Sequence, residues 1–317
     1  MILDRVALVA LVAVCTVTGC TDRSDGSAPT PTAGGPTVVA TTSIWADIAS
    51  RVLCGVPVAT LIPAGADPHT FEPSLRDRER LDAAALVVAN GGGLEESLTD
   101  LLGTAADEGV NVVEMTPHID VIAADDDHDE QDGDEHDDGD GDEHGHGMAS
   151  DPHVWQDPTR VAGALDVIAS AGAAIGLGDC AEEFAAELSE LDAEIDAMLA
   201  DIPPDRRVLV TSHDSLAYFA DRYDLEVIGT VIPSTNTLAE TNAADLGDLA
   251  DLIEQRGVTA VFTEQMEPTA DADALADRLG VAVVPLVTDT LTDDPATDSY
   301  VEMIRSNATR IAEALSP

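Results

Sequence analysis

Short apolar runs alternate with helix-length amphipathic segments along this chain, in two separate stretches. Strands are expected at 38–41, 56–62, 86–90 and 110–113, and again at 208–211, 226–230, 258–263 and 281–285. Helices are expected at 44–53, in a short segment ending at 85, and at 94–102, 157–174, 180–200, 215–223, 239–256, 271–279 and 296–315. Such alternation favours parallel sheets covered by helices on both faces. The expected fold class is α/β, with two similar lobes on mostly parallel sheets joined by one long linking helix.

The segment 180–200 is the candidate for that linking helix. Its apolar residues recur at spacings of four and three: Phe184, Leu188, Leu191, Ile195 and Met198. This narrow stripe is typical of a helix that packs along one side, and some twenty residues span roughly 30 Å. Open parallel sheets bind ligands beyond the carboxyl ends of their strands. The cleft between the two lobes is therefore the expected site.

The N-terminus carries an export signal. An apolar run at 6–17 is too short to span a bilayer, and it ends in Val17-Thr18-Gly19-Cys20. Small residues before a cysteine at this point resemble the bacterial lipobox, which implies a mature chain beginning at a lipidated Cys20. A plain secretion signal is the alternative. The segment 21–36, rich in Thr, Ser, Gly and Pro, is typical of a flexible tether.

An exported chain folds under oxidising conditions, so its cysteines are expected to pair. Cys15 and Cys20 lie in the leader, which leaves Cys54 and Cys180 for the folded part. Neither belongs to a CxxC pair, which makes both poor zinc-ligand candidates. We therefore predict a Cys54–Cys180 disulfide.

The charge excludes one class of partner. Only 14 basic residues, all arginine, oppose 62 acidic ones, so the net charge is −48. Such a surface repels nucleic acid, and no nucleic-acid partner is expected. Adaptation to a salty habitat or a GC-rich genome is the simpler explanation, and enrichment of cations near the surface is the functional one. The segment 124–150, rich in Asp, Glu, Gly and His, cannot fill a core and is predicted to be a mobile loop.

Three histidines and one aspartate stand at expected strand ends or stiffened turns. His69 and His153 each end the tripeptide Asp-Pro-His, in which proline restricts the backbone, and the aspartate could orient each imidazole. His213 and Asp289 each follow an expected strand. Three imidazoles and a carboxylate suit a tetrahedral zinc site, and nitrogen donors favour Zn²⁺ over Mn²⁺, Mg²⁺ and Ca²⁺. The alternative is four unrelated surface or core residues.

Three longer motifs contain these histidines: Asp67-Pro68-His69-Thr70-Phe71-Glu72-Pro73, Asp151-Pro152-His153-Val154-Trp155 and Ser212-His213-Asp214-Ser215-Leu216-Ala217-Tyr218-Phe219. Together they resemble the metal-binding solute-binding proteins of zinc and manganese ABC importers, over essentially all of 38–317. The resemblance implies two lobes linked by a backbone helix, with the metal held between them. It implies that His69, His153 and Asp289 are ligands. The third ligand, His in zinc carriers and Glu in manganese carriers, maps to His213, which selects zinc.

The resemblance also implies how the chain is organised and used. The predicted parts are a signal peptide with lipobox (1–20), a tether (21–36), an N-terminal metal-binding lobe (37–178), the linking helix (179–204) and a C-terminal metal-binding lobe (205–317). The expected protein is not an enzyme. It captures Zn²⁺ outside the cytoplasm and delivers it to an ABC importer. Its expected partners are the permease, the ATPase, a zinc-loading protein and the membrane, through a lipid anchor on the outer face; a periplasmic location is the alternative.

The remaining histidines fall mostly in the acidic loop: His128, His136, His144 and His146. Zinc members of the family often carry such an insert, which implies weak auxiliary zinc capture. A solvated linker is the alternative. His118 lacks such a context, and Trp45, Trp155 and Tyr218 are expected to serve packing.

Other functions stay open. A manganese carrier differs from a zinc carrier mainly at His213. A zinc hydrolase would leave one metal position to water, with Asp289 as a base, but the sequence contains no HExxH motif, serine nucleophile elbow or P-loop. A tethered adhesin is compatible with two lobes and has no positive evidence in the sequence.

Overall fold

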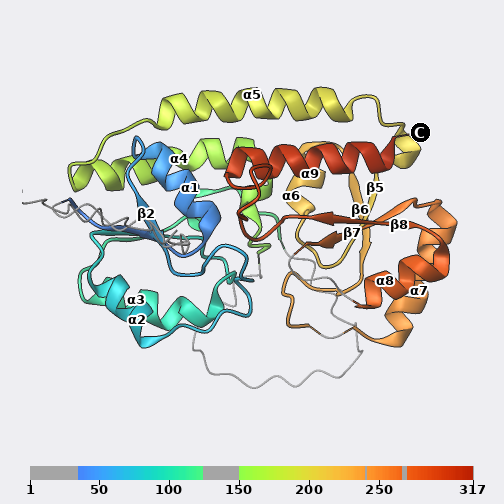
Figure 1. Cartoon of the computed structure of the whole chain (residues 1–317), viewed down its shortest axis with the longest axis horizontal. Helices are drawn as coiled ribbons and strands as arrows, with labels where there is room; N and C mark the ends of the chain where they lie inside the picture. The colour runs from blue at the N-terminus through green and yellow to red at the C-terminus, as the bar shows by residue number, and fades with distance from the viewer. Residues whose placement is uncertain (1–34, 124–149, 240, 266–269, 317) are drawn as a thin grey trace, which may run out of the picture. The chain divides into compact units, whose positions relative to one another are not determined.

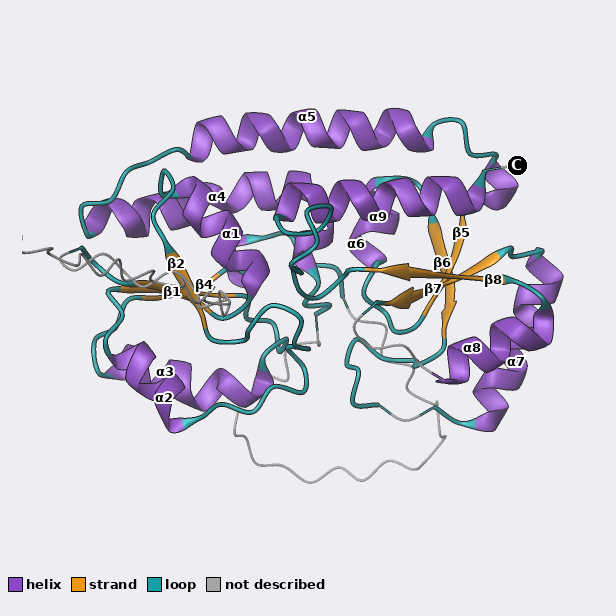
Figure 2. Ribbon diagram, in the orientation of Figure 1, coloured by secondary structure: helices purple, strands orange, loops and turns teal. Residues whose placement is uncertain are grey.

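Two four-stranded parallel sheets, one in each half of the chain, organise the structure (Figures 1 and 2). The computed structural model describes residues 35–123, 150–239, 241–265 and 270–316, all within the unit Pro31–Pro317. Cys20 and the four histidines of the acidic loop lie outside the described residues. The expected α/β class with two parallel-sheet lobes is confirmed.

The first sheet has the strand order β2-β1-β3-β4. Its strands are β1 (Val38–Ala40), β2 (Val58–Thr60), β3 (Leu86–Ala89) and β4 (Val112–Glu114). One face is covered by α1 (Ser43–Val52) and α4 (Pro158–Ala174), and the other by α2 (Leu75–Asp82) and α3 (Thr99–Asp107) (Figure 2). Both faces are therefore buried, as apolar parallel strands require.

The second sheet repeats this order as β6-β5-β7-β8. Its strands are β5 (Val208–Thr211), β6 (Glu226–Thr230), β7 (Ala260–Glu264) and β8 (Ala282–Leu286). Helices α6 (Ala217–Arg222) and α9 (Tyr300–Leu315) lie on one side, and α7 (Ala243–Arg256) and α8 (Ala270–Leu279) on the other. Short 3₁₀ turns occur at η1 (Glu96–Leu98), η2 (Thr116–His118), η3 (Val154–Gln156) and η4 (Pro204–Arg206).

Helix α5 (Ala181–Leu199) lies along both α4 and α9 (Figure 1). Its buried stripe is Phe184, Leu188, Leu191, Ile195 and Leu199, whereas Met198 is half-buried. One apolar cluster runs from α1 through α5 to α9. The two halves therefore share a continuous core on this side of the molecule.

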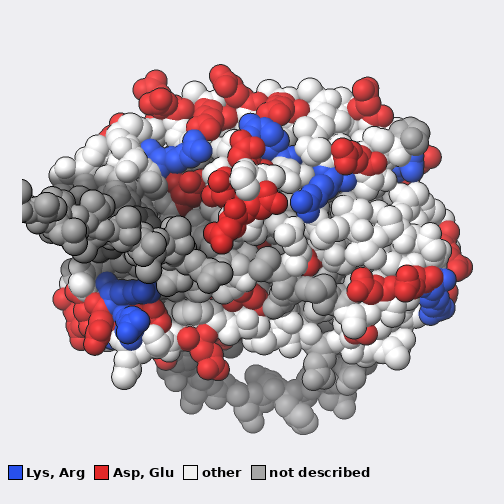
Figure 3. Space-filling view, viewed as in Figure 1, with Lys and Arg blue, Asp and Glu red and all other residues white. Residues whose placement is uncertain are grey.

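The scarce arginines attach α5 to its surroundings. Arg51 of α1 bonds Glu187 at 2.7 Å, and Arg305 of α9 bonds Glu194 at 3.0 Å. Arg222 of α6 likewise bonds Asp192 at 2.5 Å, and Figure 3 shows further acidic side chains along this edge. Because these ion pairs are partly exposed, each adds little stability. No helix among the described residues is long and apolar enough to cross a membrane.

The predicted disulfide is present. Cys54, just beyond α1, is bonded to Cys180 at the start of α5, with 5.3 Å between their Cα atoms. The Cys180 N–H also donates to the carbonyl of Val52 (2.8 Å). The bond fastens the start of α5 to the first lobe.

Helix starts differ most from the sequence-based expectation. Helix α9 begins at 300 and not at 296 because the Ser299 side chain accepts from the N–H of Glu302. Helix α7 begins at 243 and not at 239 because Asn242 caps it in the same way. The helix expected at 94–102 is a 3₁₀ turn followed by α3. In both α7 and α9, a side-chain cap fixes the position of the first helical turn.

Candidate metal centre

The four proposed donors occupy connections that follow strands. His213 lies two residues after β5, and Asp289 three residues after β8. His69 follows β2, and His153 immediately precedes the 3₁₀ turn η3 in the connection after β4. Strands β1 and β5 each stand where the strand order reverses, which is where open parallel sheets present their ligand crevice.

The structure brings these four side chains together. One ligand atom from each of His69, His153, His213 and Asp289 lies within 4.8 Å of all the others. The Nε2 atoms of His153 and His213 are 3.4 Å apart, and His213 Nε2 lies 3.6 Å from Asp289 Oδ2. His69 Nε2 is 3.9 Å from the same oxygen. Among the described residues, this is the one such group of metal-ligating side chains.

The four donor side chains are buried, and those of His69 and Asp289 lack hydrogen-bond partners among the described residues. No residue of the four is more than 6% exposed. Neither ring nitrogen of His69 and neither carboxylate oxygen of Asp289 has a hydrogen-bond partner within the described part of the chain. Buried polar atoms without partners are costly. A divalent cation at the centre of the four would supply a contact to one nitrogen of His69 and to the Asp289 carboxylate, and the three-imidazole, one-carboxylate set suits tetrahedral zinc.

Two of the imidazoles are oriented by carboxylates. His153 Nδ1 lies 2.7 Å from Asp151 Oδ1, and His213 Nδ1 lies 2.9 Å from Glu264 Oε1. In both cases Nε2 is left to face the centre. The two Asp-Pro-His turns differ, because Asp67 accepts from the backbone N–H of His69 (2.8 Å) and not from its ring. The expected aspartate–imidazole contact therefore exists for His153 and not for His69.

Burial and charge shift the protonation of the cluster. Burial, with the neighbouring imidazoles, lowers the pKa of His69 to about 3. Burial, with the charge of Glu264, raises the pKa of Asp289 to about 7. Burial opposes the charged form of His213, yet the charge and hydrogen bond of Glu264 raise its pKa to about 10. Without a cation, burial and neighbouring carboxylates favour the protonated forms of Asp289 and His213, and these protons offset part of the buried negative charge.

Sequence reasoning missed two residues that support the site. Glu264 ends β7, and Asn90 directly follows β3. The Asn90 side chain donates to the carbonyl of Pro152 (2.9 Å), next to His153. The available signal was the same one that identified His213, a polar residue at the carboxyl end of an apolar strand.

Three aromatic residues expected to serve packing are buried: Trp45, Trp155 and Tyr218. Polar atoms of Trp155 and Tyr218 also hold the site's backbone. Trp155 Nε1 donates to the carbonyl of Thr288 (2.8 Å), just before Asp289. The Tyr218 hydroxyl donates to the carbonyl of Asp151 (2.7 Å). His118, which lacked a metal-binding context, is exposed and lies outside the cluster.

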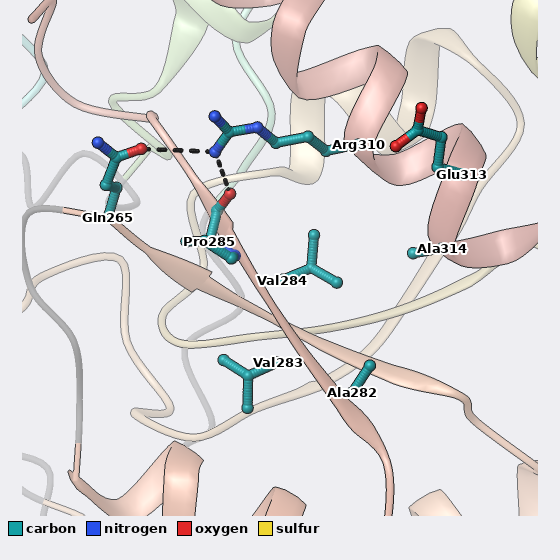
Figure 4. Close-up of a pocket in the computed structure, with 8 residues that line it drawn as sticks. All are labelled: Gln265, Ala282, Val283, Val284, Pro285, Arg310, Glu313 and Ala314. Carbon is teal, nitrogen blue, oxygen red and sulfur yellow. Dashed lines mark hydrogen bonds between the residues drawn. The ribbon is translucent and has the colours of Figure 1, made fainter.

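A separate groove of about 500 Å³ runs between the edge strand β8 and α9 and includes none of the four donors (Figure 4). Arg310 reaches across it to the carbonyl of Pro285 (2.6 Å) and to Gln265 (3.4 Å). Because proline has no N–H and Arg310 occupies its carbonyl, the sheet edge offers little to a pairing strand here.

Comparisons with known proteins find relatives that are named for metal binding. The chain is 28% identical to the zinc-binding protein TroA of Treponema pallidum over all of both chains. It is 27% identical to the manganese-binding lipoprotein MntA of Halalkalibacterium halodurans, over 82% of this chain and 81% of that one.

Solved structures show the same fold. The periplasmic zinc-binding protein TroA of Treponema pallidum matches 90% of this chain and 100% of its own, with a TM-score of 0.75 and 25% identity. A manganese-bound periplasmic protein of Candidatus Liberibacter asiaticus, 21% identical, matches 89% of this chain and 100% of its own at a TM-score of 0.74. The family model described as zinc-uptake complex component A, periplasmic, matches residues 38–314. The chain therefore belongs to the family of periplasmic component A proteins of zinc-uptake complexes.

Proposed function

We propose that this protein captures Zn²⁺ outside the cytoplasm in the cluster of His69, His153, His213 and Asp289, and delivers it to an ABC importer. The observation that carries the proposal is the convergence of four buried donors, two of which have no hydrogen-bond partner in the described part of the chain. Family membership supports the transport role. The importer's permease and ATPase are the proposed partners, with a zinc-loading protein as a further one.

Zinc is preferred over manganese because three of the four donors are imidazole nitrogens. Relatives named for zinc and for manganese both match this chain, so the choice depends on its own donors. Replacing His213 by Glu exchanges a nitrogen for an oxygen donor. The expected result is weaker zinc binding and a relative gain for manganese, measured by competition titration of each metal. An unchanged zinc preference would remove the role proposed for His213.

Carrying suits the site better than catalysis. A catalytic zinc keeps one coordination position for water or substrate, whereas four protein donors fill a tetrahedral shell. Metal analysis of purified wild type against His153→Ala tests the cluster directly. The wild type should retain one zinc per chain after dialysis, and the variant should lose most of it. Equal retention would argue against the site.

Two segments outside the metal cluster, the N-terminal segment and the acidic loop, complete the proposal. Lipid attachment at Cys20 would hold the protein at the outer face of the membrane, with 21–36 as its tether. The histidines at 128, 136, 144 and 146 would collect zinc weakly for the main site. Deleting 125–147 should abolish additional weak sites in calorimetry and leave one strong site. An unchanged stoichiometry would argue against auxiliary capture.

A further inference from the structure

Neighbouring residues in the connection between β8 and α9 are hydrogen-bonded to different lobes. Val287 is still held by the second lobe, since it exchanges two hydrogen bonds with the Asn307 side chain of α9 (3.0 and 2.6 Å). The next carbonyl, that of Thr288, instead accepts from Trp155 (2.8 Å) and Gln156 (3.2 Å). Both donors lie in the connection that carries His153. The attachment therefore passes from one lobe to the other between 287 and 288.

Thr290 is the centre of this second attachment. Its hydroxyl accepts from the N–H of Gly65 (2.9 Å) and lies 3.1 Å from the hydroxyl of Ser43. Ser43 in turn accepts from the N–H of Leu291 (2.9 Å). Thr290 is only 5% exposed, so these bonds are shielded from water. Ser43 begins α1 and Gly65 precedes His69, so Thr290 joins Asp289 to the same lobe that holds His69.

His213 has the opposite attachment. Its ring is held by Glu264 (2.9 Å), and the N–H of Ser212 donates to the carbonyl of Phe262 (2.9 Å). Both partners belong to β7 of the second sheet. The backbone and ring of the His213 connection are therefore fixed to the second lobe.

We propose that Thr290 is a positioning residue that fixes Asp289 in the frame of the first lobe. His69, His153 and Asp289 then form a three-donor half-site that moves as one body, although chain order puts Asp289 in the second lobe. His213 is the single donor carried by the second lobe. The inference rests on the proposed function, since it concerns ligands of the same metal.

This division determines what separation of the lobes does to a bound metal. A rigid-body opening withdraws one imidazole and leaves the metal on two imidazoles and a carboxylate. The hydrogen bonds of Thr290 do not cross the moving boundary, so they persist in the metal-free protein. A release step would thus begin at His213.

A double-mutant cycle separates positioning from general packing. Thr290→Val keeps the shape and removes the hydroxyl, and Thr290→Ser keeps the hydroxyl. Zinc affinity is measured by competition with a chromophoric chelator, in the wild-type background and in Asp289→Ala. We expect Thr290→Val to weaken zinc binding about 10- to 100-fold in the first background. We expect Thr290→Ser to stay within about threefold of the wild type.

The decisive comparison is the effect of Thr290→Val in the Asp289→Ala background. If Thr290 acts through Asp289, Thr290→Val changes the affinity of Asp289→Ala by less than about threefold. An equal penalty in both backgrounds, or none in the first, would overturn the positioning role. Failure of the wild type to bind zinc, or of Asp289→Ala to weaken binding, would instead overturn the proposed function.

Hydrogen exchange on the unmutated protein gives a test that does not depend on a variant's folding. The N–H groups of Gly65 and Leu291 should be equally protected with zinc and after its removal by chelator. The N–H of Ile122, which donates to the Tyr218 hydroxyl across the lobes (3.0 Å), gives the internal comparison. Loss of protection at Gly65 and Leu291 on zinc removal would overturn the assignment of Asp289 to the first lobe.

Discussion

Removing the Cys54–Cys180 bond should destabilise the protein by an amount that follows from its position. The bond closes a loop of 126 residues in sequence separation. Cross-linking a loop of that length removes about 16 cal/mol/K of entropy from the unfolded chain, or about 5 kcal/mol at 25 °C. The folded state changes little, because the N–H of Cys180 still donates to Val52.

The expected change in melting temperature follows from the size of the protein. An unfolding entropy of about 2.1 cal/mol/K per residue over roughly 250 described residues gives about 0.5 kcal/mol per degree. The variant Cys54→Ser/Cys180→Ser should therefore melt about 9 °C below the wild type. Zinc must be removed by chelator in both samples, because a bound ligand raises the melting temperature by itself.

Calorimetry and urea denaturation of the double variant measure the effect. Reduced wild type is the matched control and should melt with the double variant. Zinc affinity should remain close to that of the wild type, because no donor is displaced. A melting temperature within about 2 °C of the oxidised wild type would refute the loop-entropy reasoning.

Three further outcomes are expected. Glu264→Ala removes the carboxylate that holds His213, so zinc affinity in chelator competition should fall about 10- to 100-fold, with Glu264→Gln in between; equal affinities would show that this carboxylate does not matter. The pKa of His69 is about 3 in the folded protein and 6.5 in the unfolded chain. The neutral imidazole therefore contributes fully to the stability of the metal-free protein above pH 6.5, and this contribution is lost as the pH falls toward 3, by about 2 kcal/mol at pH ~5. In urea denaturation, His69→Gln should reduce the dependence of the free energy of unfolding on pH between about 3 and 6.5. An unchanged dependence would contradict the lowered pKa of His69. Tyr218→Phe removes the donor to Asp151 and should reduce the free energy of unfolding by about 1–2 kcal/mol; a loss below about 0.5 kcal/mol would contradict this.

The strands were the most predictable part of the fold. β5 and β6 have the bounds expected from their apolar runs, 208–211 and 226–230. Helix starts were less predictable, because apolar periodicity extends beyond the first hydrogen-bonded turn. The capping residues Asn242 and Ser299 were visible in the sequence and mark those starts better than periodicity does.

The clustering of the four donors could be predicted because strand ends of parallel sheets meet at one edge. The supporting contacts could not. Glu264 reaches His213 only because β7 lies beside β5, and this neighbour relation skips β6 in the chain. Thr290 meets Ser43 across 247 residues, because the connection between β8 and α9 returns to the first lobe. No local sequence pattern predicts either contact, because the two partners lie far apart in the chain.

The common strand order of the two sheets bears on how a protein of this kind can acquire a different metal preference. Each donor sits on its own connection beyond a strand, while the ladders β2-β1-β3-β4 and β6-β5-β7-β8 carry the fold. A substitution in one connection alters one donor and leaves both ladders intact. Related folds with zinc-binding and manganese-bound names superpose on this chain almost equally well, at TM-scores of 0.75 and 0.74. Ligands can thus be exchanged singly, by point mutation, while the strand order of both sheets stays the same.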